Sequence, residues 1–95
     1  MGVRNTSRQA YHSLHDLGNR QRDVLLAILD NGKPICNLDL SRRMVKPINQ
    51  LTPRTNELVV AGLVEESLRG ISSTGRRAIF WQVTDSGHDL INRLI

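Results

Sequence analysis

Apolar residues recur at helical spacing along most of the chain, and this pattern predicts a mainly α-helical protein. A first helix is expected from a cap at Thr6 or Ser7 to about Leu17. A second begins at a cap on Asn19 and ends at Asn31–Gly32, where the glycine stops it. A last helix begins at Thr84 and runs to the chain end. The apolar stripes of these three helices are Ala10, Tyr11, Leu14 and Leu17; Val24, Leu25, Ile28 and Leu29; and Leu90, Ile91, Leu94 and Ile95.

Residues 37–62 predict two helices joined by a tight turn. The first is short and runs from a cap at Asn37 to about Val45, with Ser41 small enough to let another helix cross closely. Lys46–Pro47 breaks the chain, because proline disfavours helix at the residue before it. The second helix follows and stops at Gly62. Its core stripe is Leu51, Thr55, Leu58 and Val59, and in the shorter helix Leu40 and Met44 face inward. This arrangement is a helix-turn-helix pattern.

Amide, hydroxyl and guanidinium side chains lie between the apolar positions of the second helix and are expected to point away from its stripe. These groups can read base edges in the major groove of DNA. The candidate base-reading residues are Asn49, Gln50, Thr52, Arg54 and Asn56. The alternative is an ordinary amphipathic helix whose polar face is only solvated.

Pro53 leaves two starts open for the second helix. With Asn49 as the cap, Pro53 falls about one turn in and removes one backbone donor. With Thr52 as the cap, Pro53 occupies the first helical position, where proline is preferred. Either an irregular first turn or a kink is expected.

After Gly62 the pattern changes to that of a β-hairpin. Leu63–Ser67 predicts one strand, Arg69–Gly75 a loop longer than a tight turn, and Arg76–Val83 the returning strand. Ile79, Trp81 and Val83 share one face of the returning strand at period two. Earlier in the chain, Lys33–Cys36 is an extended connector or a stub of strand.

Positive charge is concentrated in residues 42–77. The chain has a net charge of +4, and this segment holds seven basic residues against three acids, so the remainder sums to zero. A basic segment that coincides with a helix-turn-helix pattern favours a polyanionic partner. The candidate phosphate contacts are Arg42, Arg43, Lys46, Arg69, Arg76 and Arg77. For each of them the alternative is a surface residue without a partner.

No motif for catalysis or cofactor binding is found. His12, His15 and His88 are scattered without the cysteines or carboxylates of a zinc site, and no metal is expected. The single cysteine, Cys36, sits among apolar neighbours and predicts a packing residue. The chain has no apolar run long enough for a membrane span and no signal-peptide core at its start. We expect a cytoplasmic protein that is not an enzyme and needs no cofactor.

The order of these elements resembles the winged helix-turn-helix domains of bacterial and phage transcription regulators. Val59–Val64 looks like the junction where a recognition helix ends at glycine and enters the first wing strand. Trp81–Gly87 is similar to the "leucine-threonine-x-x-glycine" exit from the wing in the MarR-like branch, and Thr52–Leu58 looks like small phage-associated winged-helix proteins. The resemblance covers about residues 19–87. It implies a DNA-binding regulator, with repression favoured over activation.

The expected organisation is therefore a single winged-helix domain over residues 1–95. It divides into a flexible arm (1–6), a helix-turn-helix (37–62), a wing (63–83) and a C-terminal helix (84–95). Double-stranded DNA is the expected partner; a winged-helix module that binds another protein is the alternative. Apolar stripes on the first and last helices predict a homodimer held by these helices. Alternatively, both stripes pack on the core of the same chain.

Overall fold

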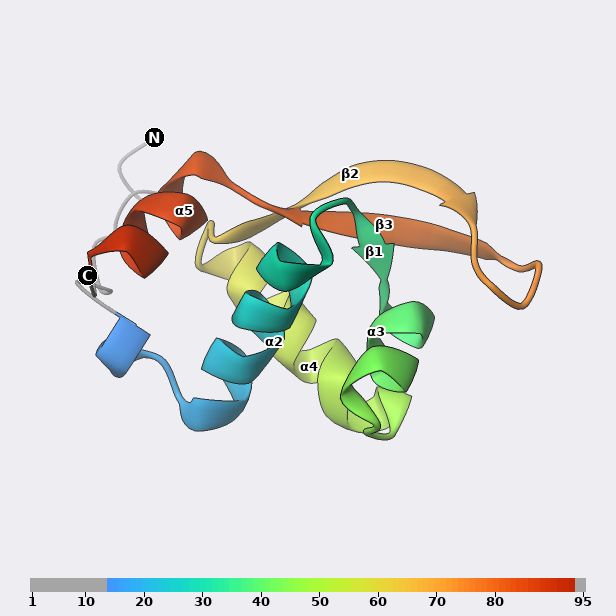
Figure 1. The fold of residues 1–95 in the computed structure, drawn as a ribbon, viewed down its shortest axis with the longest axis horizontal. Helices are drawn as coiled ribbons and strands as arrows, with labels where there is room; N and C mark the ends of the chain where they lie inside the picture. Colours follow the sequence, from blue (N-terminus) through green and yellow to red (C-terminus); the bar gives the residue numbers. More distant parts are fainter. Residues whose placement is uncertain (1–13, 94–95) are drawn as a thin grey trace.

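The computed structural model describes residues 14–93, which form a small three-stranded antiparallel sheet with helices packed against it (Figure 1). In chain order the elements are η1 (Leu14–Asp16, a 3-10 helix), α2 (Asn19–Asn31), β1 (Ile35–Cys36), α3 (Asn37–Met44), α4 (Ile48–Val60), β2 (Val64–Ile71), β3 (Arg77–Val83) and α5 (Asp85–Asn92). The result is a winged-helix-like fold: a helix-turn-helix of α3 and α4, followed by a long hairpin of β2 and β3. Among residues 14–93, no helix combines the length and the apolar character that a membrane span needs.

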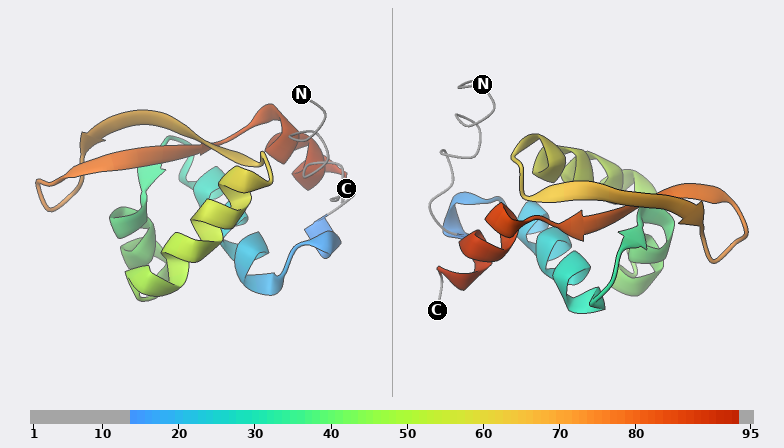
Figure 2. Two further views of the ribbon diagram at one scale, coloured as in Figure 1. Left: turned by 180° about the vertical axis from the view of Figure 1, so that it is seen from behind. Right: turned by 90° about the horizontal axis from the view of Figure 1, so that it is seen from above.

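One hydrophobic core joins the helices to the sheet. Helices α2, α3 and α4 lie on one side of the sheet, and the hairpin extends past α3 (Figures 1 and 2). Trp81 and Val83 of β3 pack against this core, as their shared face predicts. The buried apolar members are Leu14, Leu17, Val24, Leu25, Ile28, Ile35, Leu40, Leu51, Leu58, Ala61, Leu63, Val64 and Leu90.

The short strand β1 is the stub that the sequence allowed for, and it makes the sheet three-stranded. The strand order is β1-β3-β2, with Ile35 opposite Trp81 and Cys36 opposite Phe80. Cys36 is buried, in keeping with the predicted packing role, and burial raises the pKa of its thiol.

The hairpin is longer and its loop shorter than predicted. β2 continues to Ile71 because Ser67 forms a β-bulge, which shifts the register and lets the chain beyond it pair with β3. The loop is a tight turn closed by two backbone hydrogen bonds, from Gly75 N to Ser72 O at 2.9 Å and from Ser72 N to Arg76 O at 2.8 Å. Gly75 has a φ of 84°, which this three-residue hairpin loop requires.

The predicted starts of α2, α3 and α4 are each wrong by one or more residues, whereas Thr84 is the N-cap of α5, as predicted. α2 begins at Asn19 with Gly18 as its N-cap, and α3 begins at Asn37 with Cys36 as its N-cap. The Asn37 side chain instead accepts a hydrogen bond from the Thr55 hydroxyl at 3.0 Å. α4 starts at Ile48, before both of the caps considered for it.

The terminal helices pack on their own chain where the structure describes them. The predicted first helix lies mostly outside residues 14–93, and its described end is the 3-10 helix η1 rather than an α-helix. Leu14, Leu17 and Leu90 are at most 4% exposed, and Ile91 packs against the same core. The surplus apolar surface that predicted a dimer is therefore not found at Leu14, Leu17 and Leu90, and Ile91 is partly buried. Tyr11, Leu94 and Ile95 lie outside the described residues.

Helices α3 and α4 both end in a Schellman motif, with different residues at the left-handed position. At the end of α4, Gly62 N bonds to Val59 O and Leu63 N bonds to Leu58 O, both at 3.0 Å, and Gly62 has a φ of 78°. At the end of α3, Lys46 N bonds to Ser41 O at 3.0 Å. The left-handed residue there is Val45, with a φ of 56°. A β-branched side chain disfavours this conformation, so α3 ends in local backbone strain.

We predict that Val45→Gly raises the free energy of unfolding by about 1 kcal/mol. The substitution removes the steric cost of a left-handed valine, and the greater freedom of glycine in the unfolded chain offsets part of that gain. Gly62→Ala is the matched control and should lower the free energy of unfolding by about 1 kcal/mol. Urea denaturation of both variants measures the difference. A destabilised Val45→Gly protein would show that the valine side chain makes contacts that outweigh its strain.

Candidate nucleic-acid interface

The outward face of α4 is set by the residues that it buries. Leu51, Thr55 and Leu58 are at most 2% exposed and fix the rotation of the helix against α2 and α3. The Thr55 hydroxyl also donates a hydrogen bond to Asn37 Oδ1 of α3, which links the two helices. On the opposite side, Asn49 and Asn56 are exposed, as the sequence predicted.

Pro53 lies on this outward face, inside the helix. Because proline has no N–H, the Asn49 carbonyl cannot receive its usual bond from four residues on. The neighbouring Thr52 hydroxyl donates to the Ile48 carbonyl at 3.1 Å, so part of its hydrogen-bonding capacity is used within the helix. α4 is nevertheless a single helix from Ile48 to Val60.

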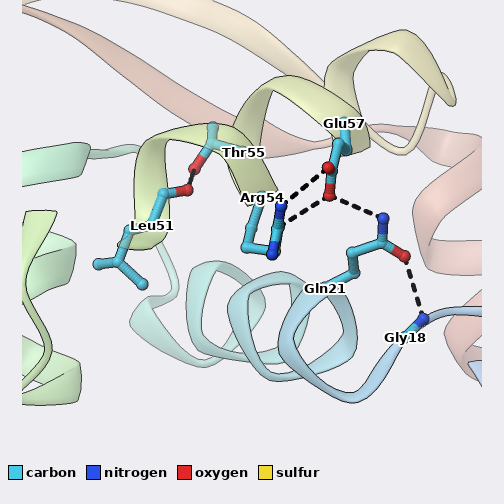
Figure 3. A network of polar contacts seen from close by, with 6 residues as sticks. All are labelled: Gly18, Gln21, Leu51, Arg54, Thr55 and Glu57. Carbon is cyan, nitrogen blue, oxygen red and sulfur yellow. Dashed lines mark hydrogen bonds and ion pairs between the residues drawn. The ribbon is translucent and has the colours of Figure 1, made fainter. Parts of the chain in front are cut away.

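Arg54 is not on the outward face, contrary to the prediction. It is turned toward α2 and held by Glu57 of its own helix, with Nε 2.8 Å from Oε1 and Nη2 donating to Oε2 at 2.9 Å (Figure 3). The sequence does carry a signal for this pairing, because an acidic residue stands three positions after Arg54 on the same helix.

Glu57 also connects α4 to α2. Gln21 donates from Nε2 to Glu57 Oε1 at 2.8 Å, and its own Oε1 accepts from Gly18 N at 3.0 Å (Figure 3). The Gln21 hydrogen bond, followed by Arg54, lowers the pKa of the Glu57 carboxyl. These contacts brace α4 against the start of α2, so Arg54 belongs to the support of the helix in this structure.

Gln50 is exposed on the flank of α4 that faces α2. It borders a small hollow together with Lys46 of the turn and Arg20 of α2. Gln50 and Lys46 thus lie together at the start of α4.

The tip of the hairpin is fastened to α3. Ser73 donates its hydroxyl to Asp39 Oδ1, and Arg42 Nη1 donates to Ser73 Oγ at 3.2 Å. The hydrogen bond from Ser73 is the main cause that lowers the pKa of the Asp39 carboxyl. We call this contact of Asp39, Arg42 and Ser73 the wing clasp. No local pattern in the sequence indicates it, because Ser73 lies 31 positions from Arg42 and 34 positions from Asp39.

Apart from Arg42, which donates to Ser73, the predicted phosphate contacts fall into two groups. Arg43 is paired with Asp30 of α2 and also donates to Asn31, and Arg69 lies 3.8 Å from Glu66. By contrast, Lys46, Arg76 and Arg77 are exposed and have no ion-pair partner within residues 14–93. Arg76 and Arg77 lie at the tip of the wing and Lys46 just before α4, so these three predicted contacts lie in the turn and the wing.

Two exposed apolar residues near this surface were not singled out in the sequence. Val45 is 87% exposed in the turn between α3 and α4, and Ile48 is 43% exposed at the first position of α4. A signal for Val45 did exist: the turn from Met44 to Pro47 is short and lacks a glycine, so another residue had to take the left-handed position.

We predict that Ser73→Ala raises the pKa of the Asp39 carboxyl toward its ordinary value of 3.8. In the folded protein the serine hydroxyl stabilises the ionised carboxylate, and its removal ends that preference. Carboxyl carbon chemical shifts across an acid titration measure the change, with Ser67→Ala as the control. An unchanged pKa of Asp39 would contradict the wing clasp.

Comparisons with known proteins support the fold and leave the sequence family open. No family model matches the chain, and no match was found among curated proteins. Among solved structures, the chain is similar to a possible transcriptional regulator from Methanosarcina mazei Go1, with a TM-score of 0.64 and 12% identity. The similarity covers 85% of this chain and 69% of the other. At this identity the likeness concerns the fold: the chain has a fold that is also found in a protein described as a possible regulator.

Proposed function

We propose that this protein is a sequence-specific double-stranded DNA-binding protein that regulates transcription. The observation that carries the proposal is the combination of exposed amides on α4 with cations that lack partners on either side of them. Asn49 and Asn56 are exposed on the helix, and Lys46, Arg76 and Arg77 are exposed in the turn and the wing. Asparagine side chains can make paired hydrogen bonds to adenine, and lysine and arginine contact phosphates.

In the proposed complex, the first turns of α4 enter the major groove. Asn49 and Asn56 read base edges from the outward face, and Gln50 and Thr52 read them from its flanks. Arg54 would reach a guanine or a phosphate only after leaving Glu57, so in our proposal it contributes less than the four uncharged residues. Lys46, Arg76 and Arg77 contact the backbone, and Arg42 stays near it through the wing clasp. Arg43 and Arg69 add positive charge, with their guanidinium groups partly engaged.

We further propose repression by occupying a promoter, in a bacterial or phage setting and in the cytoplasm.

The resemblance of residues 81–87 to the MarR-like exit motif has a physical basis here. The Thr84 hydroxyl accepts from Gly87 N at 3.0 Å and donates to Gly62 O at 2.6 Å. A side chain on residue 87 would collide with the Leu63 carbonyl at 2.4 Å. Thr84 and Gly87 are required by the packing of this junction. Their presence therefore does not by itself assign the chain to the MarR-like branch.

A protein-binding module is the second candidate, and exposed apolar residues favour it. Val60 is 74% exposed at the end of α4, and Leu68 and Ile71 of β2 are 50% and 61% exposed. These residues lie away from the amides at the start of α4. Binding of duplex DNA with a steep salt dependence would distinguish the two candidates in favour of the first.

A two-fold dimer remains a proposal for the DNA-bound state. One α4 covers a small stretch of DNA, and two copies can read half-sites one helical turn apart. Sedimentation equilibrium at micromolar concentration, without DNA and with a palindromic duplex, should show two chains for each duplex. A one-to-one complex on that duplex would refute the dimer. Ile91→Asp is unsuitable as a disrupting variant, because Ile91 packs against the core of its own chain.

We predict that the affinity for duplex DNA falls steeply with salt. Contact with roughly four to six phosphates per chain gives a slope of log affinity against log salt of about −3.6 to −5.4. Replacing Arg76 and Arg77 together with alanine should weaken binding to all sequences and make the slope shallower by about two. Gel shifts at several salt concentrations measure both effects. An affinity for duplex DNA that does not change with salt would refute the proposal.

We also predict that Asn49→Ala lowers the affinity for a selected site by about 1–3 kcal/mol and leaves binding to random DNA nearly intact. The protein should remain as stable as before, since Asn49 is exposed and Pro47, not Asn49, is the N-cap of α4. Gln50→Ala should behave in the same way. Thr55→Ala is a contrasting control: Thr55 is fully buried, so its loss should reduce stability first. Equal losses on selected and random DNA would assign Asn49 to positioning instead of base reading.

A further inference from the structure

The turn between α3 and α4 presents apolar side chains to solvent at the place where the proposed reading surface begins. Val45 is 87% exposed and Ile48 is 43% exposed. Single exposed apolar residues are common on proteins. Val45 differs because it is held in a left-handed backbone conformation that disfavours a β-branched side chain. In the folded chain, the valine therefore adds strain and buries little of its own surface.

The turn that carries Val45 is held in place from both sides. Lys46 N donates to Ser41 O at 3.0 Å, and the Ser41 hydroxyl donates back to the Lys46 carbonyl. Val45 N donates to Arg42 O at 3.3 Å. These bonds fix the direction of the Val45 side chain relative to the start of α4. An exposed apolar group with a fixed direction is suited to meeting a matching apolar group on a ligand.

The charge around the turn indicates which ligand this is. Residues 40–56 contain four basic residues, of which Arg43 and Arg54 are ion-paired with Asp30 and Glu57, and Arg42 donates to Ser73. Lys46 follows Val45 directly, is exposed and has no ion-pair partner within residues 14–93. A polyanion fits such a surface, and in the major groove of DNA the apolar group on a base edge is the methyl of thymine.

We propose that Val45 and Ile48 are specificity-determining residues that contact thymine methyl groups beside the bases read by Asn49. This inference rests on the proposed DNA-binding function and adds to it a base preference and two residues. The amides of α4 select adenine through hydrogen bonds, and the apolar pair selects thymine by covering its methyl group. The contact of Val45 with thymine in the complex then offsets the strain of its left-handed backbone.

Replacing thymidine by deoxyuridine tests the proposal, because it removes the methyl group and leaves the hydrogen-bonding edge unchanged. A site is first selected from a random duplex pool with the wild-type protein, and each thymidine in it is then replaced in turn. At one or two positions, the affinity of the wild-type protein should fall about three- to five-fold, because the burial of one methyl group is lost. Val45→Ala or Ile48→Ala should bind the unmodified site more weakly by a similar factor and show no further loss with deoxyuridine at its own position.

Two controls separate this inference from the proposed function. Val60→Ala, another exposed valine at the far end of α4, should respond to deoxyuridine as the wild type does. Val45→Gly should show the same loss as Val45→Ala, although it relieves the strain of the turn, so unfolding cannot cause the effect. Selective binding without any deoxyuridine effect, or an equal effect in wild type and both alanine variants, overturns the inference and leaves the proposed function standing. No preference for any duplex over random DNA overturns both.

Discussion

The junction at the end of α4 is the constraint on which the rest of the molecule depends. Here the helix must stop, the wing must start and α5 must return to the same point. Gly62 takes the left-handed conformation that ends the helix, and its carbonyl accepts the Thr84 hydroxyl at 2.6 Å. Thr84 N bonds to Leu63 O at 3.0 Å, and Gly87 fits closely against the same carbonyl. Within a few residues, backbone contacts therefore fix the base of the hairpin relative to α4.

A second set of contacts fixes the far end of the same hairpin. The wing clasp joins Ser73 to Asp39 and Arg42 of α3, while Glu57 and Gln21 brace α4 against α2. With both ends tied down, the amides of α4 and the cations of the wing keep a set spatial relation. In the proposed DNA complex, such pre-organisation would lower the ordering cost of binding and leave more of the interaction energy for distinguishing one DNA sequence from another.

The sequence predicted most of the elements, because each carries its own local pattern. Residues close together in the sequence determine the apolar stripes of α2 and α4, the end of α4 at Gly62 and the hairpin. Helix starts were predicted less well, since Asn37 and Asn49 are good caps by residue type, yet in the fold Asn37 bonds to Thr55 and α4 begins before Asn49.

The candidate site was predictable only in part. Exposure of Asn49 and Asn56 follows from helical spacing, whereas the turning of Arg54 toward α2 depends on Glu57 and the packing of α2. The pairing of Arg43 with Asp30 and the wing clasp bring together residues from distant parts of the chain. Helical and strand periodicity contain no information about such pairs. The strain at Val45 could have been expected from the lack of glycine in its turn, but its exposure required the structure.

In the proposed complex, one surface meets DNA: the start of α4, the preceding turn and the wing tip. Amide chemical-shift mapping of the isotope-labelled protein during titration with a selected duplex tests it most directly. We expect the largest shifts in residues 45–56 and 72–77, with little change in α5. Large shifts confined to Val60, Leu68 and the outer part of β2, or no shifts at all, would contradict it.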